Sequence, residues 1–123
     1  MTPGGFHSFE HRWALAEAFR LHSRIGKARV ERRIHSLNRR LKAGLAAMPH
    51  VTLVTPQSSS LSAGLVCFTV DRLSPGAVVE ALRRRRVIAT VTPYDPPYAR
   101  LAPGLLNTPA DVDRALRAVR ALR

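Results

Sequence analysis

A helical pattern running from Phe9 to Met48 is the feature that most restricts how this chain can fold. Apolar residues recur there at intervals near three and four: Leu15, Phe19, Ile25, Val30, Ile34, Leu37, Leu41, Leu45 and Met48. Gly26 interrupts the pattern, so the segment is either one bent helix or two helices, and Pro49 ends it. This length exceeds that of the usual globular helix, which indicates that the segment braces a larger body than this chain supplies.

The rest of the chain alternates short apolar runs with turn residues. Four runs are predicted to be strands, at residues 51–54, 65–70, 87–91 and 98–101. Ser74 and Thr108 each precede a proline, which predicts the N-caps of two further helices, and Asp111 provides an acidic first turn for the second. The predicted fold is therefore α+β, in the order α-β-β-α-β-β-α.

The length of 123 residues fits one compact domain. No apolar stretch is long enough to span a bilayer and the start lacks the features of a signal peptide, so we expect a cytoplasmic protein with no membrane partner. The lone Cys67 cannot form an internal disulfide, and its apolar neighbours predict a buried strand residue.

The net charge of +12 raises the hypothesis of a basic α+β module that binds RNA or DNA. Its arginines are spread along helical faces, however, and no aromatic residues interleave with them as a stacking platform would require. The densest run, Arg83 to Arg86, falls at a predicted helix end, where cations are favourable. Solvated helix surfaces are therefore favoured over nucleic-acid binding. A non-catalytic domain that binds a partner through the long helix is a second alternative.

Arg100 stands out because it lies in a proline-flanked apolar segment, residues 98–103, shortly before Asn107 and Thr108. A guanidinium presents a planar fork of donors that matches a carboxylate, so this position suggests a substrate-carboxylate site. From the residues alone, an arginine that pairs with Asp95 or caps a carbonyl is the more ordinary explanation.

Several stretches, taken in their order and spacing, resemble the C-terminal small domain of class V aminotransferase-type enzymes. These fold type I enzymes use pyridoxal phosphate (PLP) and include cysteine desulfurases and isopenicillin N epimerase-like proteins. The stretches are Gly4-Gly5-Phe6-His7, Ala14 to Phe19, Ile25-Gly26-Lys27, Leu41 to Leu45, and Arg100 followed by Asn107-Thr108. The resemblance covers nearly the whole chain. It implies a small, mainly antiparallel sheet with helices packed on one side.

The resemblance also implies roles for individual residues. Residues 1–123 would form a single small domain, without the large domain that carries the catalytic residues. Arg100 falls where the family places the arginine that binds the substrate's α-carboxylate. Gly5 matches a glycine that approaches the PLP phosphate, but Phe6 stands where the family commonly has a threonine, and Ser8 would have to supply the lost hydroxyl.

PLP enzymes need a lysine that forms a Schiff base with the cofactor. This chain has only Lys27 and Lys42, both expected to be solvated on the long helix, and neither matches the family's lysine. We therefore expect no catalytic residue and no covalently bound PLP here, and no activity from the chain alone. The implied partners are a PLP-binding large domain or second subunit, and an amino-acid substrate. The complete enzyme would be a homodimer that catalyses transamination, epimerisation, or elimination such as desulfuration.

His7 to His11 also matches the H-x-x-E-H pattern of a class of zinc proteases. That site needs a helix and a third ligand further along, and no downstream acidic residue has a suitable setting. We therefore predict no metal site.

Overall fold

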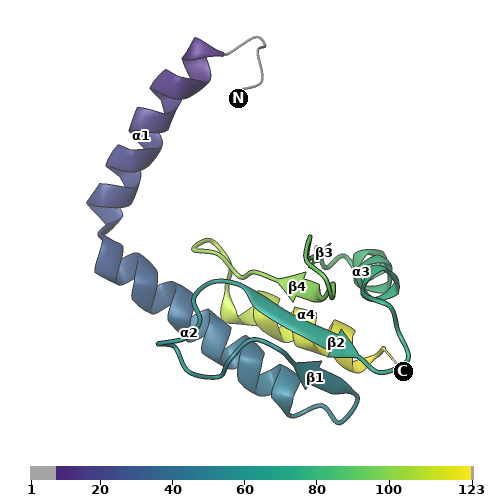
Figure 1. Ribbon diagram of the computed structural model, residues 1–123. Coiled ribbons are helices and arrows are strands. Elements are labelled where there is room, and N and C mark those ends of the chain that lie inside the picture. Colours follow the sequence, from purple (N-terminus) through teal and green to yellow (C-terminus); the bar gives the residue numbers. More distant parts are fainter. Residues whose placement is uncertain (1–7, 123) are drawn as a thin grey trace. The chain divides into compact units, whose positions relative to one another are not determined.

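The computed structural model describes residues 8–122 of the chain (Figure 1). Its elements are α1 (Phe9–Ile25), α2 (Lys27–Ala46), β1 (Val51–Leu53), β2 (Val66–Val70), α3 (Pro75–Arg84), β3 (Thr90–Val91), β4 (Ala99–Leu101) and α4 (Pro109–Arg120). The chain divides into two compact units, Met1–Glu31 and Arg32–Arg123. No helix within residues 8–122 is both long enough and apolar enough to cross a membrane.

The predicted long helical segment is two helices, α1 and α2, because Gly26 ends the first. Gly26 has a φ of 89°, a left-handed conformation that glycine adopts without the steric cost of a side chain. Its N–H donates to the carbonyl of His22 at 3.0 Å, and its own carbonyl accepts from Arg29 and Val30 at the start of α2. Of the two arrangements that the sequence allowed, the structure therefore has two helices.

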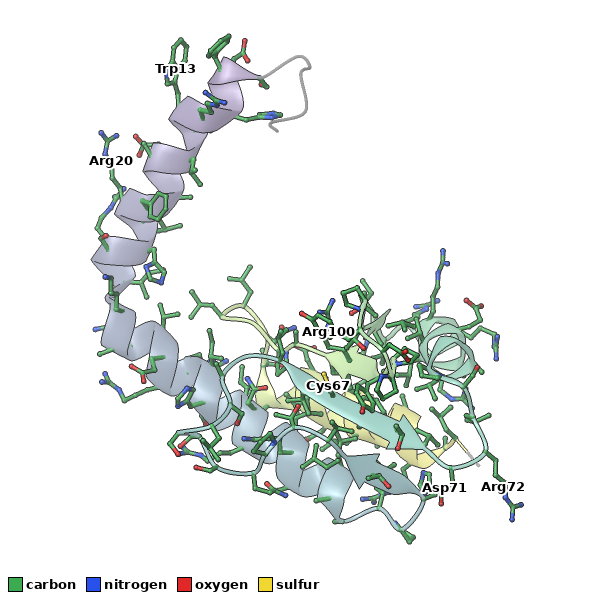
Figure 2. The ribbon with its side chains drawn as sticks, viewed as in Figure 1. Trp13, Arg20, Cys67, Asp71, Arg72 and Arg100 are labelled. Atoms are coloured by element: carbon green, nitrogen blue, oxygen red, sulfur yellow. The ribbon has the colours of Figure 1, made fainter. Side chains whose placement is uncertain are left out.

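Helix α1 has no buried side chain. Its large apolar side chains are instead exposed: Phe9, Trp13, Leu15, Phe19 and Leu21. Figure 2 shows Trp13 projecting from this helix. Apolar residues on several sides of one helix are typical of a helix that other protein covers.

The sheet has the strand order β1-β2-β4-β3, and each neighbouring pair is antiparallel. The α+β prediction and the order of elements are confirmed, apart from the division of the first helix. The predicted strand at 87–91 is shorter than expected, because the N–H of Val87 donates to Leu82 and closes the end of α3. Only Thr90 and Val91 remain to pair with β4.

The core lies on one face of this sheet. Along β2, Val66, Phe68 and Val70 are buried, whereas Cys67 and Thr69 on the other face are only half-buried. Residues of the three later helices complete the core: Leu37, Leu41, Leu45, Val78, Leu82, Val112 and Val119. In Figure 1, α4 lies behind β2 and β4. The alternation of side chains along a strand thus explains why Cys67, predicted to be buried, lies on the open face instead.

Helices α2 and α4 approach each other closely at Gly44. A Cβ at Gly44 would collide with the terminal methyl groups of Leu116, so any larger residue would force the Leu116 side chain to move. The same pair of helices is joined by Arg40, whose Nε and Nη2 donate to the two carboxylate oxygens of Asp113 at 2.6 and 2.8 Å. Both side chains are partly exposed, and such a pair contributes little stability compared with the apolar packing beside it.

Lys42 contradicts the prediction that both lysines are solvated. It is 2% exposed, and its ammonium donates to the carbonyls of Pro56 and Gln57 and to the hydroxyl of Ser62, at 3.0, 2.8 and 2.6 Å. Three acceptors match the three donors of an ammonium, which is how a buried charge becomes tolerable. Lys42 therefore ties the loop between β1 and β2 to helix α2. Lys27 is exposed, as predicted.

We predict that Lys42→Met lowers the free energy of unfolding by about 3 kcal/mol, because it keeps the packed stem but removes the ammonium that donates to the Pro56 and Gln57 carbonyls and to the Ser62 hydroxyl. Urea denaturation of the purified chain measures this value. Lys27→Met is the matched control, expected to change stability by less than about 0.5 kcal/mol. Equal midpoints for the two variants would show that the buried ammonium does not stabilise the loop.

Candidate functional site

Arg100 lies at the middle of β4, between the strands β2 and β3. Its register partners are Cys67 on β2 and Thr90 on β3, so all three residues lie on the face of the sheet away from the core. Figure 2 labels Arg100 and Cys67 on their neighbouring strands. The Nε of Arg100 donates to the hydroxyl of Thr90 at 2.9 Å. This bond fixes the plane of the guanidinium without using its two terminal nitrogens.

The terminal nitrogens of Arg100 meet no acceptor among residues 8–122. In particular, Arg100 does not pair with Asp95 and does not cap a carbonyl there, which were the ordinary alternatives for this residue. A half-buried arginine with an oriented but unused fork is suited to bind a carboxylate bidentately.

Arg100 lines a groove of about 440 Å³. Its walls come from the segment 86–90, from the end of β4 with the loop after it, and from α4: Arg86, Val87, Ile88, Ala89, Thr90, Arg100, Leu101, Ala102, Pro103, Asn107, Asp111, Val112, Arg114 and Ala115, with Leu41 of α2. This volume lies in the range of small-molecule sites. The lining is largely apolar, with a few charged groups that would orient a ligand.

The loop between β4 and α4 is held in place from both sides. Arg33 of α2 donates to the carbonyl of Asn107 at 2.7 Å, and the side-chain oxygen of Asn107 accepts from the N–H of Gly104 at 2.8 Å. These bonds give the groove one rigid wall.

Helix α4 begins with the predicted N-cap. The Thr108 hydroxyl accepts from the N–H of Asp111, and the Asp111 carboxylate accepts from the N–H of Thr108 at 2.8 Å, which together form a capping box. The bond from the Thr108 backbone, followed by that from its hydroxyl, lowers the pKa of Asp111 from its ordinary value of 3.8. The predicted cap at Ser74 is confirmed too, since its hydroxyl accepts from Ala77 at 3.2 Å.

The two residues suggested for the PLP phosphate are less informative. Gly5 lies outside the described residues. Ser8 precedes α1, and its hydroxyl donates to the carboxylate of Glu10 at 2.8 Å. A phosphate at Ser8 would have to displace this bond and would lie beside a negative charge, so the role assigned to Ser8 stays a prediction with an electrostatic cost.

The zinc hypothesis rested on His7 and His11, and His7 also lies outside the described residues. Among residues 8–122 no three His, Cys, Asp or Glu side chains come together as a metal site would require.

Sequence reasoning missed Thr90, Arg86 and Arg114 as neighbours of the candidate site. Thr90 is next to Arg100 only because β3 pairs with β4, and that register cannot be read from two residues of strand. Arg86 was assigned to a solvated helix end. All four arginines of that run are indeed exposed, but Arg86 also lines the groove.

Comparison with known proteins identifies the family. The family model described as aminotransferase class-V matches residues 8–92, more than half of the chain, and the chain belongs to this family. The isopenicillin N epimerase of Streptomyces clavuligerus is 31% identical over 115 residues, which cover 89% of this chain and 28% of that protein.

Solved structures of related proteins share the fold. An apo cysteine desulfurase from Thermococcus onnurineus NA1 superposes with a TM-score of 0.81 at 26% identity, over 88% of this chain and 29% of its own. The cystine C-S lyase C-DES, in complex with its reaction product cysteine persulfide, superposes with a TM-score of 0.75 at 29% identity, over 87% of this chain and 28% of its own. Another structure of C-DES holds glycine covalently linked to the PLP cofactor.

These comparisons confirm the resemblance to class V aminotransferase-like enzymes, including the use of PLP by relatives. This chain spans only 28% or 29% of the length of the relatives it matches.

The capping box predicts a pH dependence of stability. Because folding lowers the pKa of Asp111, its contribution is fully present above 3.8 and is lost as the pH falls through that value towards the folded-state pKa. Asp111→Asn should therefore reduce the loss of stability between neutral and strongly acidic pH, measured from urea midpoints at each pH. The hydrogen bond from Arg40 lowers the pKa of Asp113 as well. Asp113 therefore contributes to the pH dependence of stability that remains in Asp111→Asn.

The exposed Asp95 provides the control for this experiment, since it forms no ion pair among the described residues. Asp95→Asn should leave the slope as in the wild type. An Asp111→Asn curve parallel to that of the wild type would contradict the role of the cap.

Proposed function

We propose that this chain is the C-terminal small domain of a PLP-dependent class V aminotransferase-type enzyme acting on an amino acid. Its contribution is Arg100, which binds the substrate's α-carboxylate. The reaction is transamination, epimerisation, or elimination such as desulfuration, and the catalytic residues belong to a large domain outside this chain. The observation that carries the proposal is the guanidinium of Arg100, which Thr90 orients and whose terminal nitrogens meet no acceptor among residues 8–122, in a residue that lines a groove of small-molecule size.

The exposed apolar side chains of α1 support the need for further protein. Trp13 is 75% exposed and Phe19 is 65% exposed, although large apolar side chains are normally covered. Relatives are more than three times as long as the matched region. A large domain, in the same polypeptide or as a separate subunit, is the partner that we assign to this surface.

The described residues do not fit covalent attachment of PLP. The Lys42 amine donates to three protein oxygens in a buried setting, and Lys27 is exposed at the start of α2. PLP, when bound to a complete enzyme, stabilises negative charge that develops at the α-carbon. The role of this chain is to orient the substrate: a carboxylate held by two parallel hydrogen bonds fixes which α-carbon bond faces the cofactor.

The remaining assignments complete the proposal. The complete enzyme is a cytoplasmic homodimer, and Gly5 and Ser8 approach the cofactor's phosphate. Residues 1–123 act together as the small domain of that enzyme.

We predict that Arg100→Lys in the complete enzyme lowers kcat/KM by roughly a hundredfold, a loss of about 2 to 4 kcal/mol in transition-state stabilisation. Lysine keeps the charge but cannot make the bidentate contact. Steady-state kinetics with amino-acid substrates, on the chain joined to its large domain or on a full-length relative, measures the effect. Arg100→Ala should be at least as damaging.

Arg84→Ala is the control, because Arg84 is exposed at the end of α3, pairs only weakly with Glu80 at 3.4 Å and does not line the groove. It should change kcat/KM little. Near-normal activity of Arg100→Lys together with an inactive Arg84→Ala would contradict the carboxylate assignment. It would indicate instead that the basic run at residues 83–86 is needed for activity.

A further prediction concerns the purified chain alone, which should form no PLP adduct that survives dialysis. The physical reason is the lack of a buried, unoccupied lysine amine among residues 8–122. Visible absorbance after dialysis checks this. Retained absorbance that disappears in Lys27→Met or Lys42→Met would show that one of these lysines binds the cofactor.

A further inference from the structure

Arg86 adopts a backbone conformation that is normally reserved for glycine. It follows α3 with a φ of 59°, at the position where the chain turns out of the helix. There its N–H donates to Arg83 at 2.9 Å, and the N–H of Val87 donates to Leu82 at 3.0 Å. Helices commonly end in this way with glycine at the left-handed position, because a side chain there is strained. An arginine at this φ is less stable than a glycine would be, as is also true of Arg72.

Arg86 is among the residues that line the same groove as Arg100. Arg114 of α4 lines it as well, so three arginines belong to the lining of one groove of about 440 Å³. Asp111 is the one acidic residue of the lining, and its carboxylate is engaged by the capping box with Thr108. The groove therefore carries an excess of two positive charges and has more guanidinium groups than a single carboxylate requires.

We propose that Arg86, together with Arg114, binds a second acidic group of the substrate whose α-carboxylate is held by Arg100. The substrate class is then amino acids that carry a further carboxylate in the side chain. Arg86 and Arg114 would set this specificity, because a side-chain carboxylate would gain charge-assisted hydrogen bonds that an apolar side chain cannot make. This inference rests on the proposed function, since it takes Arg100 as the site of the α-carboxylate.

The test uses the purified chain and two five-carbon acids, glutarate with two carboxylates and pentanoate with one. Their dissociation constants are measured by NMR titration at low salt. Wild-type chain should bind glutarate at least about tenfold more tightly than pentanoate. In Arg86→Gly most of this difference should disappear, while the thermal midpoint rises because the left-handed strain is relieved. A gain in stability with a loss of binding cannot be attributed to unfolding.

Arg72 offers a matched control. It is exposed, has a φ of 62° and does not line the groove. Arg72→Gly relieves the same kind of strain and removes the same charge, so it should raise the thermal midpoint yet keep the preference for glutarate. Arg114→Gln should weaken glutarate binding without the gain in stability.

Several results would overturn the inference. These are equal affinities for the two acids, no detectable binding of either, and an Arg86→Gly chain that still prefers glutarate as the wild type does. The inference would also be wrong if Arg86→Gly weakened the binding of a short DNA oligonucleotide but not the binding of glutarate. That result would indicate a nucleic-acid surface. Pentanoate separates the two proposals. If Arg100→Lys binds pentanoate as tightly as the wild type does, the carboxylate role of Arg100 is wrong. If Arg100→Lys weakens pentanoate binding but Arg86→Gly keeps the preference for glutarate, only the role of Arg86 is wrong.

Discussion

The position of β4 between β2 and β3 is the constraint on which the rest of the structure depends. Antiparallel pairing on both sides fixes Arg100 at the centre of the sheet, opposite Cys67 and Thr90. Its neighbours Ala99 and Leu101 point into the core, so a shift of one residue would bury a guanidinium and expose two apolar side chains. The register of β4 therefore determines both which side chains are buried in the core and which way Arg100 points.

Much of this fold could be predicted from local signals. The caps at Ser74 and Thr108, the break at Gly26 and the order of elements each follow from a few adjacent residues, and all are present. The extents of the strands could not be predicted in the same way. The run at 87–91 has the composition of a strand, but its first residue completes the turn after α3, because helix-end hydrogen bonds compete for the same N–H.

The candidate site was predictable only in part, because it depends on contacts between distant residues. Arg100 was singled out by its apolar setting together with the resemblance to the family, whereas Thr90, which orients it, is brought alongside by strand register. Lys42 illustrates the same limit. A lysine on a helix rich in arginines is normally solvated, yet Lys42 is buried and its ammonium donates to the carbonyls of Pro56 and Gln57. No helical periodicity reveals acceptors supplied by a loop more than ten residues away.

Two surfaces of this chain differ in character: the exposed side chains of α1 and the groove that Arg100 lines. The apolar side chains of α1 are exposed without any polar network to hold a ligand, which suits coverage by a large domain. The groove that Arg100 lines has the opposite character: the bonds of Arg33 and Asn107 hold one of its walls, and three arginines belong to its lining. A wall that is held before binding reduces the entropy lost when an anion binds, which is a condition for orienting a substrate. The two surfaces therefore fit the two parts of the proposal: contact with a large domain at α1, and binding of an anionic substrate at the groove.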